Sequence, residues 1–150
     1  MQQKIIIDTN VYIDIFNDDR HESIRNPFER IVFLVHPVLH ELWMGAKGKR
    51  EIRHLATFQN EFVKLKRLLI PTPATVLSIG RVCHQLRSSG KLDPVHPKHY
   101  NDITIACLAR QIGATVITHN THDFSIVQSV IDFEFEQPRS FRDRNYESAF

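Results

Sequence analysis

The chain has 150 residues, of which 42% are hydrophobic and 24% charged, with five glycines and seven prolines. This composition is typical of a globular protein, and the length fits one domain that needs no disulfide or structural metal. The net charge of +2 permits a nucleic-acid partner without requiring one. Cys83 and Cys107 lack metal-binding spacing, so we predict reduced packing residues. No apolar run approaches the roughly 20 residues of a membrane span, so we expect a cytoplasmic protein without a membrane partner.

Short apolar segments alternate with helical patterns along the chain. Buried strands are predicted at residues 4–8, 30–37, 67–71 and 114–120, with a further short strand near Phe133. Helices are predicted after a cap at Thr9 or Asn10, within 38–48, over 51–66, from a cap at Thr75 to about Gly90, and over 101–112. This alternation predicts an α/β fold: a three-layer α/β/α sandwich around a parallel sheet of four to five strands.

The chain reads as a single domain over residues 1–150. No repeat, low-complexity segment or internal linker interrupts it. We expect the packed core to span about residues 4–135. Residues 139–150 are rich in charge, and we expect a mobile tail there.

Four acidic residues punctuate segments that are otherwise apolar. Asp8 ends the first strand, Glu41 is flanked by apolar residues, Asp102 begins an apolar helix, and Asp123 follows a later strand. Each has an ordinary explanation: a helix cap for Asp8, a solvent-facing side chain for Glu41, a helix dipole for Asp102 and an Asx turn for Asp123. Functional sites of open parallel sheets nevertheless lie beyond the carboxyl ends of the strands.

Convergence of these four carboxylates would require protonation or a bound cation. Two unit charges about 4 Å apart repel by roughly 4 kcal/mol at an effective dielectric constant of about 20. An all-oxygen ligand set with neutral Asn and Thr side chains nearby suits Mg²⁺ or Mn²⁺. Such ions take further ligands from water and substrate phosphates, which points to phosphodiester hydrolysis.

Four stretches, "IIIDTNVYIDIF", "VLHELWMGA", "NDITIACLARQIGATVIT" and "THNTHDF", together resemble the PIN domain, in particular the VapC-type toxins of bacterial toxin–antitoxin pairs. The resemblance covers about residues 4–135. It implies a metal-dependent ribonuclease that is usually dimeric and is silenced by a small antitoxin. It assigns metal binding to Asp8, Glu41, Asp102 and Asp123.

The resemblance also indicates which residues support the metal ligands. Asn10 matches the small polar residue after the first aspartate, and Thr118 matches the hydroxyl residue at the end of the later strand. Some members carry an acid two residues beyond that threonine, where this chain has Asn120. Asp123 must then supply the fourth charge, and Asn120 joins the supporting residues.

A basic cluster and several histidines lie near these motifs. The cluster, which could steer RNA phosphates or simply form a solvated helix face, contains Lys47, Lys49, Arg50 and Arg53. His119 and His122 flank the Asp123 turn, where they could touch substrate or simply face solvent. His36 and His40 lack the spacing of a zinc motif.

We therefore expect a Mg²⁺- or Mn²⁺-dependent endoribonuclease, the toxin of a toxin–antitoxin pair, with RNA as substrate and a homodimeric assembly. Three alternatives stay open: a housekeeping RNA-processing nuclease without an antitoxin, a phosphatase-like hydrolase, and a non-catalytic RNA-binding module. A phosphatase with Asp8 as nucleophile would normally carry a second aspartate at position 10, where this chain has Asn10.

Overall fold

The computed structural model describes residues 2–18 and 30–138, so the tail predicted at 139–150 lies outside the described residues. The strands are β1 (Gln3–Ile7), β2 (Arg30–Val35), β3 (Leu68–Leu69), β4 (Thr115–Ile117) and β5 (Glu134–Glu136). The helices are α1 (Thr9–Asp18), α2 (His36–Gly45), α3 (Gly48–Lys64), α4 (Pro73–Ser88), α5 (Pro97–Ile112) and α6 (Thr121–Gln128). None of the helices within these ranges is long and apolar enough to cross a membrane.

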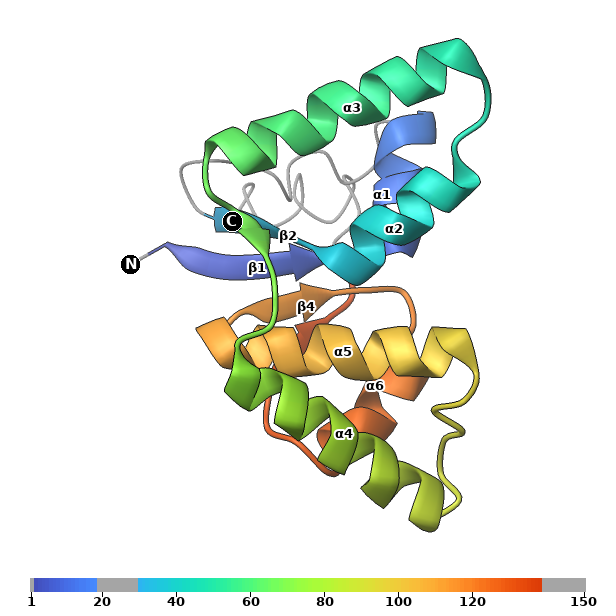
Figure 1. Cartoon of the computed structure of the whole chain (residues 1–150), viewed down its shortest axis with the longest axis vertical. Coiled ribbons are helices and arrows are strands. Elements are labelled where there is room, and N and C mark those ends of the chain that lie inside the picture. Colours follow the sequence, from blue (N-terminus) through green and yellow to red (C-terminus); the bar gives the residue numbers. More distant parts are fainter. Residues whose placement is uncertain (1, 19–29, 139–150) are drawn as a thin grey trace, which may run out of the picture.

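All five described strands run parallel, in the order β3-β2-β1-β4-β5. The central strand β1 pairs with β2 on one side and β4 on the other, with Ile5 opposite both Val32 and Thr115. Helices α1, α2 and α3 lie on one side of the sheet, and α4, α5 and α6 lie on the other (Figure 1). The predicted three-layer α/β/α fold is confirmed, with the larger of the two expected strand numbers.

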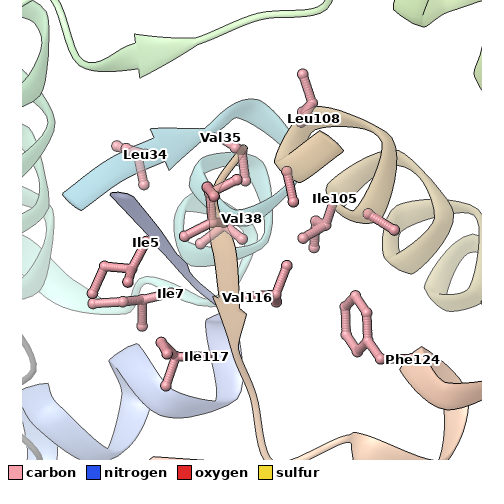
Figure 2. Close-up of a cluster of buried hydrophobic side chains, with 14 of the residues drawn as sticks. Ile5, Ile7, Leu34, Val35, Val38, Ile105, Leu108, Val116, Ile117 and Phe124 are labelled. Carbon is pink, nitrogen blue, oxygen red and sulfur yellow. The ribbon is translucent and has the colours of Figure 1, made fainter. Parts of the chain in front are cut away.

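The core forms on both faces of β1. Its isoleucines are almost fully buried because a central strand of a parallel sheet is covered by helices on each side. Figure 2 shows Ile5 and Ile7 beside Ile117 of β4, with Ile105 of α5 and Phe124 of α6 in the same cluster. Both cysteines are free thiols, Cys107 buried in the core and Cys83 half-buried.

The strand order places a topological switch point beside β1. From β1 the chain adds β2 and β3 on one side, and it then returns to place β4 on the other. The backbone N–H of Asp8 donates to the carbonyl of Ile117 at 2.9 Å, which continues the β1–β4 ladder to the ends of both strands. Ligands of such folds bind where the order of strands reverses, at the carboxyl ends.

Two helices start earlier than predicted. α5 begins at Pro97 rather than at residue 101, with the His96 ring accepting from the backbone N–H of Lys98 at 3.3 Å. Its first turn is polar and mostly exposed, so an apolar pattern cannot reveal it. α4 is capped by Thr72 rather than Thr75, because the Thr72 hydroxyl accepts from the Thr75 backbone N–H at 3.3 Å.

The ends of β2, α2 and α3 also differ from the prediction. β2 ends at Val35, and α2 begins directly at His36 with Pro37 in its first turn, where a missing N–H costs no hydrogen bond. α3 begins at Gly48, three residues before the predicted start, and ends two residues earlier than predicted.

Two further corrections concern α1 and α6. Asp8, rather than Thr9 or Asn10, precedes the first turn of α1: its carbonyl accepts from Tyr12 at 3.2 Å and its carboxylate from Thr9 at 2.8 Å. The stretch predicted as a turn around Asp123 is the start of α6. α6 has too few apolar residues to give a helical period, and it packs on the core through Phe124 and Val127.

Candidate active site

Asp8 is buried at the carboxyl end of β1, and both of its oxygens accept hydrogen bonds. Oδ1 accepts from the backbone N–H of Thr9 at 2.8 Å, and Oδ2 accepts from the hydroxyl of Thr118 at 2.7 Å. Thr118 directly follows β4, so this bond crosses the switch point. Burial raises the pKa of Asp8 above its ordinary value although both hydrogen bonds lower it. The carboxyl group is therefore held in one orientation.

Glu41 reaches the same edge from the second turn of α2. It is half-buried, and its Oε1 accepts from Nδ2 of Asn101 at 3.1 Å. Burial and the charge of Asp8 raise the pKa of Glu41. The buried Thr9 hydroxyl lies beside Glu41 and lowers the pKa of Glu41. Its geometry, however, does not satisfy a hydrogen bond to Glu41 or to any other described residue. This edge therefore has a buried polar group without a partner in the described chain.

Asp102 lies one turn inside α5 and is only 4% exposed. Burial, together with the charges of Asp8, Asp123 and Glu41, raises its pKa to about 8, and Lys98 opposes this shift. The charges of Asp8, Glu41 and Asp123 all act on Asp102, and Asn120 joins Asp102 to Asp123, so the four carboxyl groups lie near one another. The structure thus brings together the four acids that the sequence singled out.

Asn120 joins the last two of these acids. Its Nδ2 donates to Oδ2 of Asp102 at 3.0 Å and to Oδ2 of Asp123 at 3.1 Å. Its backbone N–H donates to the Thr118 hydroxyl at 2.9 Å, which links this side of the site to Asp8. An acid at position 120 could not donate these bonds, so the amide allows two neighbouring carboxylates to remain close.

Three residues at the start of α5 belong to the site and were missed by the sequence reading. They are Lys98, His99 and Asn101: Lys98 acts on the acids by its charge, His99 Nε2 lies 3.8 Å from Asp123 Oδ2, and Asn101 donates to Glu41. They were concealed because residues 91–100 fall between two predicted helices. The available signal was spacing, because Lys98 precedes Asp102 by one helical turn.

Asn10 and the two histidines near Asp123 occupy the margin of the site. Oδ1 of Asn10 accepts from the backbone N–H of His119 at 3.3 Å, and the His119 ring lies 2.6 Å from Oδ2 of Asp14. Asn10 thus ties α1 to the segment after β4 rather than capping α1. His122 is exposed.

The predicted basic cluster lies exposed at the start of α3 and the turn before it. Of its members, Arg50 lines a cavity of about 650 Å³ that also reaches Thr9 and Glu41. The backbone N–H of Lys47 donates to Glu51 at 2.6 Å, which fixes the entry into the helix. This cavity, between α1, α2 and α3, opens beside the acidic site.

A divalent cation suits the donor set of this edge. Among the described residues, no three His, Cys, Asp or Glu side chains already surround one point as metal ligands. Mg²⁺ typically binds through one or two carboxylates and keeps water or phosphate oxygens for the rest of its shell. The clustered charges and the unpartnered Thr9 hydroxyl fit a hydrated cation of this kind.

The rings of His36 and His40 lie 5.7 Å apart, and burial lowers the pKa of His36.

The fold and the site together define an α/β protein with an acidic centre at the switch point of a parallel sheet. The sequence matches the family model of the PIN domain over residues 5–129. The chain therefore belongs to the PIN domain family. A comparison with curated proteins gives no match.

Several solved structures share the fold. VapBC-1 from nontypeable Haemophilus influenzae aligns with a TM-score of 0.69 at 20% identity, over 90% of this chain and 98% of that chain. DNA-bound VapBC from Salmonella typhimurium aligns with a TM-score of 0.67 at 21% identity, over 92% and 100%. VapBC2 from Rickettsia felis, bound to a promoter DNA fragment, aligns with a TM-score of 0.65 at 20% identity, over 90% and 98%. At these identities the likeness establishes the fold.

Proposed function

We propose that this PIN-domain protein is a metal-dependent endoribonuclease that hydrolyses RNA phosphodiester bonds and is the toxin of a toxin–antitoxin pair. The observation that carries the proposal is the gathering of Asp8, Glu41, Asp102 and Asp123 at the switch point, where burial and the charges of the other three acids raise the pKa of Asp102 to about 8. Such a cluster is costly without a cation, and an acidic oxygen site is suited to phosphate chemistry.

Mg²⁺ or Mn²⁺ would be held by Asp8, Glu41 and Asp102, with Asp123 at the margin. A cation bound there would supply activation of a water nucleophile and stabilisation of the leaving oxygen. Substrate phosphate would complete the oxygen environment, since the chain offers no preassembled cage.

The neutral side chains of the site have orienting roles in this proposal. Thr118 and the Thr9 backbone hold the two oxygens of Asp8, and Asn101 holds one oxygen of Glu41. Asn120 holds Asp102 and Asp123 side by side. Because each acid keeps at least one lone pair free of these bonds, the supports fix direction without blocking a ligand.

The decisive experiment is cleavage of a structured RNA by the purified protein with Mg²⁺ or Mn²⁺. Asp8→Asn should abolish cleavage, because the amide removes one charge from the site while it keeps the shape of the side chain. Asp132→Asn is the matched control, since Asp132 is exposed and precedes β5, at the opposite edge of the parallel sheet from the strand ends that carry the acids. Equal cleavage by the wild type and Asp8→Asn, or none by the wild type with either metal, would contradict the proposal. A phosphoaspartate on Asp8 would instead indicate the phosphatase alternative.

We also propose that an antitoxin segment docks in the cavity beside Glu41. The cavity is large enough for several side chains, carries the apolar groups of Ile13, Phe16 and Leu42, and opens at the acidic site that an inhibitor must cover. Ile13 is 47% exposed, so Ile13→Asp should fold and still arrest growth on expression, yet escape relief by the neighbouring small reading frame. Ile52→Asp on α3, at 44% exposure and outside the lining, is the control. A wild-type protein that cleaves RNA without arresting growth would indicate a housekeeping nuclease.

A homodimer is the proposed assembly. Large apolar side chains are exposed on both sides of β3, at the end of α3 and the start of α4: Val63, Leu65, Ile70, Val76 and Leu77. Clustered exposed apolar side chains are typical of interaction surfaces. Leu77→Asp should shift the protein to monomers in analytical ultracentrifugation. A wild-type protein that is monomeric at micromolar concentration would contradict this assembly.

A further inference from the structure

Lys98 shares a face of α5 with Asp102. The two residues are four apart in one helix, a spacing that places their Cβ atoms about 5–6 Å apart. Lys98 is exposed and Asp102 is buried, so the lysine stands on the solvent side of the acidic site. A long flexible side chain at this position can reach over the opening through which a substrate phosphate must pass.

The charge of Lys98 acts on the acidic site without being neutralised by a direct partner. It lowers the pKa of Asp8, Glu41 and Asp102. Its neighbours are engaged, since the His99 ring lies against Asp123 and the Asn101 amide donates to Glu41. Within residues 2–18 and 30–138, the Lys98 ammonium forms no hydrogen bond or ion pair. The bond from Lys98 to the His96 ring comes from its backbone N–H. Its three donors are therefore available to a ligand.

We propose that Lys98 is a positioning residue of the nuclease reaction, which binds a non-bridging oxygen of the RNA phosphate that enters the carboxylate site. This inference rests on the function proposed above. An acidic cluster repels the RNA backbone, and a fixed cation at its opening offsets that repulsion for the one phosphate that must come close. Lysine suits this task because its ammonium is a compact, mobile point charge with three donors.

The test compares Lys98→Gln, Lys98→Arg and a control, Lys91→Gln, which changes an exposed lysine in the loop before α5. Lys98→Gln should raise KM for a single-stranded RNA by about 10- to 100-fold, as expected for a lost charged hydrogen bond, with a smaller change in kcat. Lys98→Arg should restore most of the loss, and Lys91→Gln should behave as the wild type.

Binding separates the failure of this inference from the failure of the proposed function. In an Asp8→Asn background, where no cleavage is expected, Lys98→Gln should lower the slope of log affinity against log salt by about 0.7, the value for one phosphate contact on a single strand. If the wild type cleaves RNA but Lys98→Gln leaves KM and this slope unchanged, the inference is wrong while the function stands. If the wild type does not cleave RNA, the proposed function fails. In that case an unchanged slope for Lys98→Gln would also overturn the role of Lys98, whereas a lowered slope would show that Lys98 still contacts a phosphate.

Discussion

Replacing Asp102 with asparagine is expected to stabilise the metal-free protein near neutral pH. Asp102 is buried in α5, and burial together with three neighbouring acids raises its pKa from 3.8 to about 8. An asparagine has the same shape, and its carbonyl oxygen can still accept from Asn120. The substitution therefore removes the cost of keeping this carboxyl group protonated at a pH where the unfolded chain ionises it, and it leaves the packing in place.

The sign and size of the effect follow from the two pKa values. Below pH 3.8 the carboxyl group is protonated in both the folded and the unfolded chain, so it exerts no pH-dependent penalty. As the pH rises toward 8, the unfolded chain releases the proton while the folded chain retains it, and the free energy of unfolding falls. At pH 7 the interval of roughly three pH units corresponds to about 4 kcal/mol. Because coupled acids share part of this penalty, we expect a gain of about 2–4 kcal/mol, or about 5–12 °C in Tm.

Thermal and urea unfolding in EDTA between pH 5 and pH 8 measure this effect. The wild type should lose stability across the range relative to Asp102→Asn, and Asp132→Asn, an exposed change, should follow the wild type. Mg²⁺ should raise the Tm of the wild type more than that of Asp102→Asn, because a ligand stabilises the state that binds it. Parallel pH profiles for the wild type and Asp102→Asn, or a less stable Asp102→Asn at pH 8, would refute the reasoning.

Three further predictions concern other parts of the fold. Thr118→Val should lower the free energy of unfolding in urea by about 1–3 kcal/mol, because it leaves Oδ2 of the buried Asp8 without its donor. Thr118→Ser should keep most of this stability. Equal stability of the two variants would contradict the role of the hydroxyl. Iodoacetamide at pH 8 should leave Cys107 unlabelled in the folded protein, because the side chain is buried and burial raises the pKa of its thiol to about 12. After denaturation the same reagent should label Cys107, as peptide mass spectrometry can check. Gly113→Ala should destabilise the protein by about 1–2 kcal/mol, because φ of Gly113 is 68° at the end of α5. Gly80→Ala within α4 should instead stabilise it by up to about 1 kcal/mol, since an added Cβ meets nothing within 4 Å at either site. Urea unfolding that gives the same sign for both substitutions would count against this conformational explanation.

The sequence was sufficient for those parts of the fold whose signal is local. The isoleucines before Asp8 and the apolar stretch before Thr118 predict buried strands, and their polar ends predict which edge of the sheet carries function. The same local reasoning concealed the start of α5, since the turn that contains Lys98 has no apolar period. α6 was hidden for a similar reason, because its eight residues bury only Phe124 and Val127.

The parts of the site that could not be predicted depend on contacts between distant residues. Asn120 could be recognised as an amide in place of an acid, and its bond to Asp123 is local, but its bond to Asp102 arises only from the packing of α5 against α6. Likewise Asn10 has the composition of a helix cap, yet its side chain accepts from His119, 109 residues away. Local capping preference yields here to a tertiary hydrogen bond.

The hydrogen bond between Thr118 and Asp8 spans 110 residues, and this separation has a consequence for the order of folding. β1 can pair with β2 early, but its other edge stays open until β4 closes against it. Closure over so long a loop is slow compared with helix formation or local pairing. A growing chain that has not yet reached β4 would thus expose Asp8 to water, its carboxylate lacking the Thr118 donor. The acidic centre is therefore expected to be among the last features of the molecule to assemble.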